Sequence, residues 1–271
     1  MSTHNTVGHQ ELRTGSPSRP TPLPGLYSPL GGDRSLLRLG AVLAVVGLLL
    51  QVPLGFWHPH QADPNDSEGA FAEYAQSNNW VLVHIGQFTG ALLITLALVA
   101  LARHLARQPG IAGALAILGG AAAVLVAAVF AVQMAVDGVA LKATIDAWTI
   151  ADGSAEKASA FLVADGIRSL EKALSGFFHL CNGVTLLALG LALATGRGFP
   201  RWLGWVGAAA GAAFLVEGVV VAQTGFSHQA ANIALVPTVL LPVFLIGVAV
   251  AMWRTTPISQ EGEPVQGTLT R

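Results

Sequence analysis

Hydrophobic residues occur in six long runs separated by shorter polar segments. The runs cover approximately residues 36–56, 80–102, 111–136, 174–194, 202–222 and 233–253. Each is long enough for an α-helix to cross a hydrocarbon layer about 30 Å thick. None has the strict alternation of a membrane β-barrel, and backbone groups in lipid must be paired within helices or a closed barrel. The pattern predicts an all-α fold, a transmembrane bundle of six helices spanning residues 36–254.

Polar segments form both ends of the chain. Residues 1–35 are rich in Ser, Thr, Pro and Gly, and residues 255–271 form a second polar segment. Such compositions bury too little apolar surface to offset the entropy of ordering, so both are predicted to be disordered tails. The N-terminal tail is not expected to be a cleavable signal, because the first apolar run begins late and no small-residue cleavage site follows it.

The connection between the first two runs contains the pattern of a short amphipathic helix. Asn65 and Glu68 have the spacing of a capping box. Phe71, Tyr74 and Ala75 follow at i, i+3 and i+4, which places them on one helical face. We expect this helix to lie on the extracytoplasmic face.

The connection over residues 137–172 is long and contains the sequence WTIADGS, which predicts a break between two helical pieces. Ser154 is predicted to cap the second piece, with Glu156 in its first turn. We expect the two pieces to lie on the outer face as a partial lid. The alternative is that they extend the third and fourth spans into water.

Composition supports the membrane prediction and excludes several functions. The chain is 53% hydrophobic and 11% charged, against about 25% charged residues in soluble domains. The formal net charge of −1 argues against a nucleic-acid partner. The apolar runs and the low share of charged residues make the lipid bilayer the expected environment. The single Cys181 excludes an internal disulfide and a cysteine-based metal cluster. The sequence has no P-loop and no GxSxG nucleophile motif.

Basic residues predict the orientation of the bundle. They lie before the first run, in alternate connections and after the last run: Arg34, Arg38, Arg103, Arg107, Arg197, Arg201 and Arg254. Cytoplasmic connections carry an excess of Lys and Arg, so both termini are predicted to be cytoplasmic and the acid-rich connections extracytoplasmic. Arg greatly outnumbers Lys, a composition typical of bacteria with high GC content, and we therefore expect a multi-pass protein of a bacterial plasma (inner) membrane.

Polar residues within or beside the runs gather at the outer ends. Ionisable groups inside a membrane are costly and are functional candidates by default. Glu171, Ser175, His179 and Asn182 have 4-4-3 spacing, which forms one helical stripe. The candidate metal ligands are His58, His60, His84, Asp137, His179 and Glu217.

Four interpretations of these residues remain open. Histidine and carboxylate ligands suit Zn²⁺ or another divalent transition metal, in a metal-dependent membrane enzyme or a binding protein. His84 and His179, at similar predicted depth, could instead be the axial ligands of a haem. The same groups could titrate in a cation or proton transporter or a sensor, or bind a small ligand. They could also be interhelical polar contacts with a structural role. A cavity ringed by these residues would favour a functional site.

Small residues at helical spacing predict close helix contacts. Gly86 and Gly90, and likewise Gly207 and Gly211, are small-xxx-small pairs. They are expected to serve packing within the bundle, and Gly-rich faces would also permit a homo-oligomer.

Four segments together carry a resemblance to a family: HPHQADPND, FAEYAQSNNWVLVHIGQF, VDGVALK and EKALSGFFH. They resemble a group of uncharacterised six-span membrane proteins of actinobacteria and related bacteria. The resemblance covers most of the chain from the first to the sixth span and excludes the tails. It implies the six-helix fold and the bacterial membrane location, and it carries over no catalytic residue, substrate or cofactor.

Overall fold

The computed structural model describes residues 29–59, 61–63 and 65–255. Its elements are α1 (Pro29–Trp57), α2 (Ser67–Ala75), α3 (Trp80–Leu105), α4 (Ile111–Ala135), the π-helical segment η1 (Val136–Leu141), α5 (Lys142–Ile150), α6 (Ser154–Thr195), α7 (Arg201–Thr224) and α8 (His228–Arg254). Within these residues every element is helical, and six helical segments are long and apolar enough to cross a membrane. The predicted all-α bundle of six spans is confirmed.

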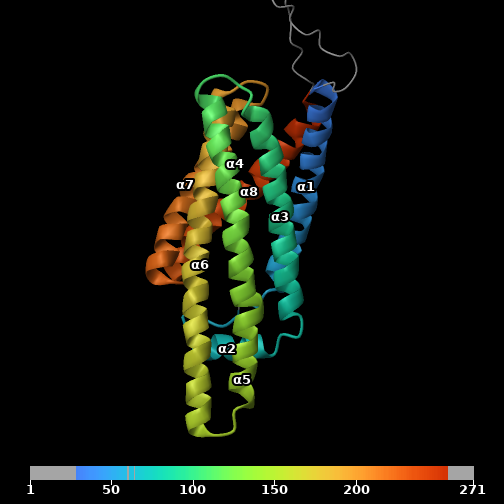
Figure 1. Ribbon diagram of the computed structural model, residues 1–271. Helices are drawn as coiled ribbons and strands as arrows, with labels where there is room; N and C mark the ends of the chain where they lie inside the picture. The colour runs from blue at the N-terminus through green and yellow to red at the C-terminus, as the bar shows by residue number, and fades with distance from the viewer. Residues whose placement is uncertain (1–28, 60, 64, 256–271) are drawn as a thin grey trace, which may run out of the picture.

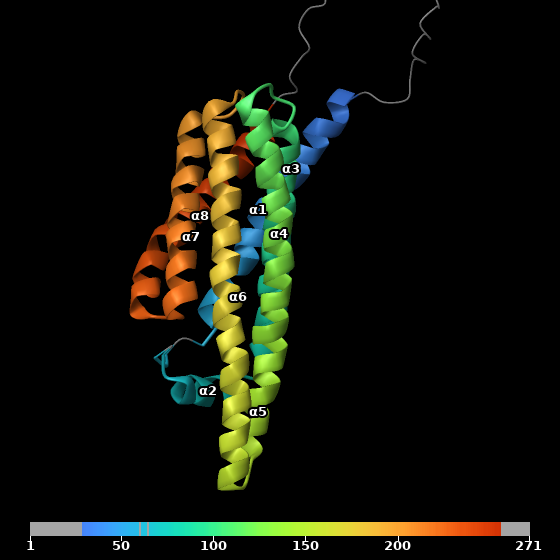
Figure 2. The same ribbon diagram turned by 60° about the vertical axis from the view of Figure 1, so that its left-hand side comes forward.

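The six long helices run side by side along one axis (Figures 1 and 2). The main helix pairs are α6 with α7, α1 with α3, and α4 with α6, and α8 packs on α7 and α1. We call one end of the bundle the arginine-rich end, because Arg103 and Arg107 lie where α3 ends and Arg201 begins α7. The opposite end, where α1 ends and α3 begins, is called the acidic end.

The helices extend beyond several predicted boundaries. Helix α1 begins at Pro29, so the last part of the predicted 1–35 tail is helical, whereas residues 1–28 and 256–271 lie outside the described residues. The segment Ile111–Ile150 has 40 residues and α6 has 42. At 1.5 Å per residue each is about 60 Å long, twice the thickness of a hydrocarbon core.

The predicted lid over residues 137–172 is wrong. Segment η1 and helix α5 continue α4 without a break, and α6 returns as a single helix from Ser154. The two pieces therefore extend the third and fourth spans as a hairpin that projects past the acidic end (Figure 2). Glu156 lies in the first turn of α6 as predicted, but the N-cap is Gly153 instead of Ser154.

The predicted short helix between the first two spans is present as α2. Its N-cap is Asp66, not Asn65, and the Asp66 side chain accepts hydrogen bonds from the Glu68 and Gly69 amides. The apolar face of α2 packs against the projecting hairpin. This second hydrophobic cluster contains Phe71, Trp80, Leu141, Ile145, Trp148 and Ala164, with Tyr74 and Ala75 packed against it. Helix α2 is thus held beside the acidic end of the bundle.

The four glycines predicted to mediate close contacts do so within the chain. Gly86 and Gly90 of α3 face α1. Gly207 of α7 faces α8, and Gly211 faces α6. The structure uses these faces inside the bundle, so a second copy of the chain would have to pack on other surfaces.

Candidate metal site at the acidic end

A buried pair of ionisable residues joins α3 to the π-helical segment. His84 Nε2 lies 2.9 Å from Asp137 Oδ2, and the two residues are only 1% and 6% exposed. The other imidazole nitrogen, Nδ1, lies 2.7 Å from the main-chain carbonyl of Trp80. Both nitrogens of His84 therefore face an oxygen atom.

This arrangement requires a positive charge or a proton beside Asp137. A carbonyl oxygen only accepts hydrogen bonds, so Nδ1 of His84 must be the donor to Trp80. In a neutral imidazole Nε2 then carries a lone pair, which would face a carboxylate lone pair at 2.9 Å. A second proton, on either group, or a metal cation converts this repulsion into attraction.

The π-helical turn is what places Asp137 against His84. Short π-helical turns within α-helices are frequent at functional sites. The indole Nε1 of Trp80 donates a 3.0 Å hydrogen bond to the carbonyl of Asp137. Gly138 makes room for His84, because a Cβ atom at position 138 would lie 2.5 Å from the His84 Cβ. Trp80 and Gly138 thus allow the π-helical turn to pack directly against the His84 imidazole.

His58 completes a group of three ligating side chains. The ligand atoms of His58, His84 and Asp137 all lie within 4.8 Å of one another. The His58 Nδ1 is 2.8 Å from the carbonyl of Pro59, which fixes the ring, and the ring packs 4.9 Å from Trp80. Burial lowers the pKa of His58, although the nearby Asp137 opposes this effect. The lowered pKa favours the neutral imidazole, the form that binds metals.

A cavity of about 390 Å³ lies beside this group. Among the described residues its lining includes three carboxylates, Glu73, Asp137 and Glu171, against one guanidinium, Arg168. Oδ1 of Asp137 and Oε2 of Glu171 are buried and accept no hydrogen bond within the described chain. Excess negative charge and unsatisfied acceptors both favour a cationic or hydrogen-bond-donating ligand.

Arg168, fully buried, neutralises part of this charge. Its Nη1 lies 3.7 Å from Glu171 Oε2 and donates a 3.2 Å hydrogen bond to the Tyr74 hydroxyl. Its guanidinium also lies over the rings of Phe71, Tyr74 and Phe226. The sequence pattern placed Tyr74 only on the apolar face of a short helix and gave no role to Arg168. The available signal was the position of Arg168, one helical turn before Glu171 on the polar stripe.

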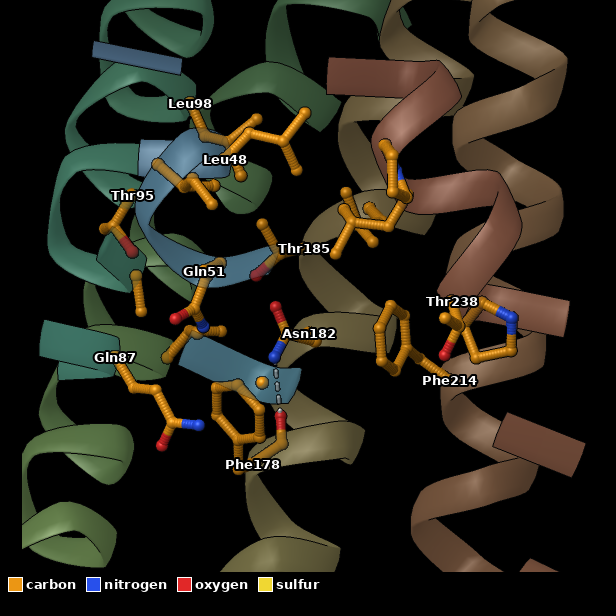
Figure 3. Close-up of a pocket in the computed structure, with 18 of the residues that line it drawn as sticks. Leu48, Gln51, Gln87, Thr95, Leu98, Phe178, Asn182, Thr185, Phe214 and Thr238 are labelled. Carbon is orange, nitrogen blue, oxygen red and sulfur yellow. Dashed lines mark hydrogen bonds between the residues drawn. The ribbon is translucent and has the colours of Figure 1, made fainter. Parts of the chain in front are cut away.

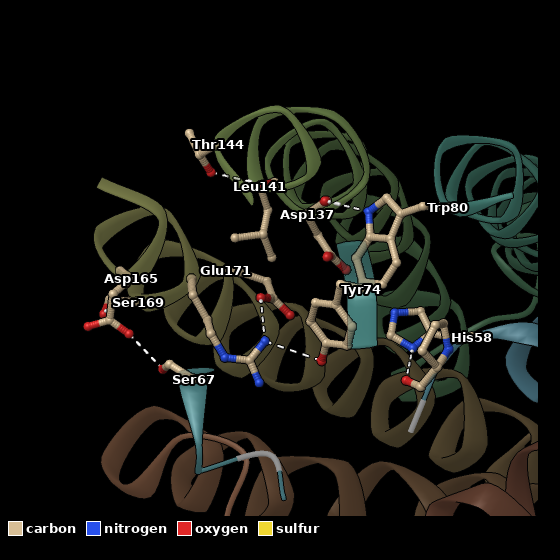
Figure 4. A network of polar contacts seen from close by, with 12 residues as sticks. His58, Ser67, Tyr74, Trp80, Asp137, Leu141, Thr144, Asp165, Ser169 and Glu171 are labelled. Carbon is tan, nitrogen blue, oxygen red and sulfur yellow. Dashed lines mark hydrogen bonds and ion pairs between the residues drawn. The ribbon is translucent and has the colours of Figure 1, made fainter. Parts of the chain in front are cut away.

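Helix α2 and the loop before it close one side of the site. Ser67 donates a 2.7 Å hydrogen bond to Asp165 of α6, as Figure 4 shows. Glu73 accepts hydrogen bonds from the amides of Gln61 and Ala62. These contacts hold the loop that carries His58 against the end of the bundle.

Two other predicted ligands, His179 and Glu217, form a separate pair. His179 Nδ1 lies 3.4 Å from Glu217 Oε1 of α7, beside the rings of Phe178 and Phe214. Close contact between α6 and α7, at Gly176 and Gly218 for example, brings these two residues together. His84 faces η1, whereas His179 faces α7, so the two imidazoles predicted to share a haem contact different partners. His60 lies outside the described residues.

The chemistry of the trio fits a divalent transition metal. Ligand atoms on a tetrahedral zinc ion lie about 3.4 Å apart, given bonds of about 2.0–2.1 Å. The trio needs only small side-chain movements to reach that spacing from separations of up to 4.8 Å. The carbonyls that hold the two imidazoles are the outer-shell partners usual for metal-bound histidines.

Comparison with known proteins gives no further guide to the site. No protein-family model, no curated protein and no solved structure matches the chain.

Proposed function

We propose that the chain is a multi-pass protein of a bacterial plasma membrane that binds a divalent transition-metal cation at its extracytoplasmic face. Zn²⁺ is the first candidate, with His58, His84 and Asp137 as ligands. The acidic end is then the outer end, because the arginine-rich end carries the positive charge typical of cytoplasmic connections.

One observation carries the proposal. His84 directs a nitrogen at the Asp137 carboxylate at 2.9 Å while its other nitrogen is committed to a carbonyl. His58, whose pKa is lowered by burial, offers a third ligand atom within 4.8 Å. Three protein ligands leave one coordination position for water or a ligand, as in catalytic and exchangeable zinc sites.

The test measures metal content in purified protein. Wild-type protein in mild detergent is loaded with Zn²⁺, desalted and analysed for metal and by visible absorption. We expect about one zinc per chain in the wild type. Bound zinc should fall at least tenfold in His84→Ala and Asp137→Asn, because each substitution replaces one of three ligands. The matched controls are His179→Ala, which removes another histidine paired with a carboxylate, here partly buried, and His104→Ala, a buried histidine at the arginine-rich end.

The outcomes separate the alternatives. Zinc retained in His84→Ala, or lost equally in the His104→Ala and His179→Ala controls, would overturn the assignment of ligands. A wild-type protein without metal after loading would reduce the His84–Asp137 pair to a proton-sharing contact. A Soret band would replace zinc by haem as the bound group.

A metal-dependent membrane enzyme is a second candidate, favoured by the cavity beside the trio. Glu171 lines this cavity together with His58 and Asp137, and its Oε2 accepts no hydrogen bond among the described residues. A carboxylate in this position can accept a proton from metal-bound water. Zinc-dependent hydrolysis of a micellar ester or amide that is lost in Glu171→Gln, with zinc content unchanged, would support this candidate.

A further inference from the structure

A second, larger cavity lies in the middle of the bundle. It measures about 570 Å³, within the range of about 300–1,000 Å³ typical of ligand sites. Helices α1, α3, α4, α6, α7 and α8 all contribute to its lining, as Figure 3 shows in part. Most lining residues are apolar, such as Leu48, Leu98 and Phe214, with a few amides and hydroxyls between them. We call this cavity the central chamber.

The central chamber opens between α1 and α8 toward the surrounding lipid. The two helices pack together at the arginine-rich end, where Met252 of α8 meets Gly40 of α1. They diverge toward the acidic end (Figures 1 and 2). In that half, Val52 and Phe56 of α1 are 45% and 75% exposed although they line the chamber, and Thr238 of α8 is also exposed. A molecule in the bilayer can therefore reach the chamber from the side.

Two glutamines lie between the central chamber and the cavity of about 390 Å³ at the acidic end, which we call the polar cavity. Gln51 of α1 and Gln87 of α3 line both cavities. Oε1 of Gln51 is buried and has no hydrogen-bond partner within the described chain. The mostly apolar chamber thus borders the cavity that contains Asp137 and Glu171.

The atoms that line the polar cavity restrict the chemistry of any group that binds there. Buried oxygens of Gln133 and Asp137 accept no hydrogen bond in the described chain, and Glu171 Oε2 has an ion-pair contact of 3.7 Å with Arg168 but no hydrogen bond. Each of the three acceptor residues is more than nine-tenths buried. All three atoms are acceptors, so a ligand must supply donors. The carboxylates of the lining outnumber its one guanidinium, Arg168, so an anionic head such as a phosphate is disfavoured.

From this geometry we infer that the protein binds an amphiphile from the membrane. Its single apolar chain lies in the central chamber, and its hydroxyl- or amine-bearing head lies in the polar cavity next to His58 and Asp137. A two-chain phospholipid is larger than the chamber. The inference goes beyond metal binding and does not require a metal ion.

The test uses three probes that share one chain and differ in the head. Chain-diazirine analogues of a monoacylglycerol, a long-chain alkylamine and a fatty acid are placed at equal mole fraction in phosphatidylcholine nanodiscs that hold the full chain. After irradiation, mass spectrometry maps the labelled residues. We expect the hydroxyl and amine probes to label chamber residues such as Ala91 and Thr185 at least tenfold more than the fatty acid.

A matched pair of variants tests the entrance. Thr238→Trp fills the opening, whereas Val239→Trp alters the neighbouring exposed residue, which does not line the chamber. Chamber labelling should fall at least tenfold in Thr238→Trp and stay at the wild-type level in Val239→Trp. Equal labelling in both variants, or labels only on lipid-facing residues, would overturn the chamber assignment. Equal labelling by all three probes would overturn the head-group assignment.

The experiment is repeated with a chelator, so that its result is independent of zinc. Chamber labelling that persists without zinc supports the inference even if the proposed metal site fails. Zinc bound at wild-type stoichiometry without chamber labelling would instead refute the inference and leave the metal site standing.

Discussion

Buried aromatic residues fix the positions of the polar groups at the acidic end. Trp80 holds the π-helical turn through its indole hydrogen bond to the Asp137 carbonyl, and its own carbonyl holds His84. Tyr74 packs 4.4 Å from Trp80 and accepts a hydrogen bond from Arg168. Each ring therefore combines apolar packing with one polar contact, the arrangement that buried Trp and Tyr usually adopt.

The environment of Tyr74 gives a pH prediction. Burial raises the pKa of Tyr74, and Arg168 only partly opposes the rise. In Tyr27→Phe, Tyr74 is the only tyrosine left. Its phenolate absorbance should then appear with a midpoint above 10 in the folded protein and at about 10 after denaturation.

The sign of the stability change follows from this shift. Because the folded pKa exceeds the unfolded value, Tyr74 contributes stability that is complete below about pH 10 and is lost as the pH rises through the folded pKa. A folded midpoint at or below 10 would show that Arg168 dominates over burial.

Among the elements, η1 has the most specific role. It interrupts the regular α-helical pattern between α4 and α5 at the point where Asp137 must face α3. Within η1, Gly138 leaves the space that the His84 side chain occupies. The element therefore couples backbone geometry to the candidate metal ligands.

Gly138→Ala tests this coupling. The new Cβ would lie 2.5 Å from His84 Cβ and 2.9 Å from its Cγ, so the imidazole must move. We expect a loss of about 1–3 kcal/mol in the free energy of unfolding, as for other overpacked sites, and at least a tenfold weaker zinc affinity.

Gly166→Ala is the matched control, since position 166 is an exposed helical glycine of α6 with no atom within 4 Å of a new Cβ in the described chain. It should be neutral or stabilise the protein by about 0.5–1 kcal/mol. Thermal unfolding and zinc titration of both variants provide the measurement. Equal behaviour of the two would mean that His84 does not depend on the space at Gly138.

The whole molecule is a membrane bundle with a projecting hairpin. The continuous segment α4–η1–α5 and helix α6 are each about twice as long as a hydrocarbon core is thick. Helix α2 packs against the part of them that projects past the acidic end. Asp137 lies about 40 Å along the segment α4–η1–α5 from Ile111, which corresponds to the far boundary of a bilayer. The candidate metal site would thus lie where the membrane meets water.

Cysteine labelling tests the proposed orientation. In a Cys181→Ser background, Asp152→Cys places a thiol at the tip of the hairpin and Thr195→Cys places one at the arginine-rich end. A membrane-impermeant maleimide should label position 152 in intact cells and position 195 only after permeabilisation. The reverse pattern would place the arginine-rich end outside and the candidate site in the cytoplasm.

The sequence alone determined the features that depend on local pattern. Run length and hydropathy gave the six spans, and i, i+3, i+4 spacing gave α2. Both are properties of a single segment in its solvent. The polar positions also identified His58, His84 and Asp137 as candidates, because ionisable groups within or beside a membrane span are energetically costly and are functional candidates by default.

Only the tertiary structure decided which candidates meet. Spacing places His84 and His179 at similar depth in the membrane, but depth does not determine which neighbouring helix each side chain faces. Helix packing turns His179 toward Glu217 of α7, whereas the π-helical turn brings Asp137 to His84. The central chamber likewise follows from the divergence of α1 and α8. Contacts between segments far apart in sequence determine these features, and no local pattern encodes them.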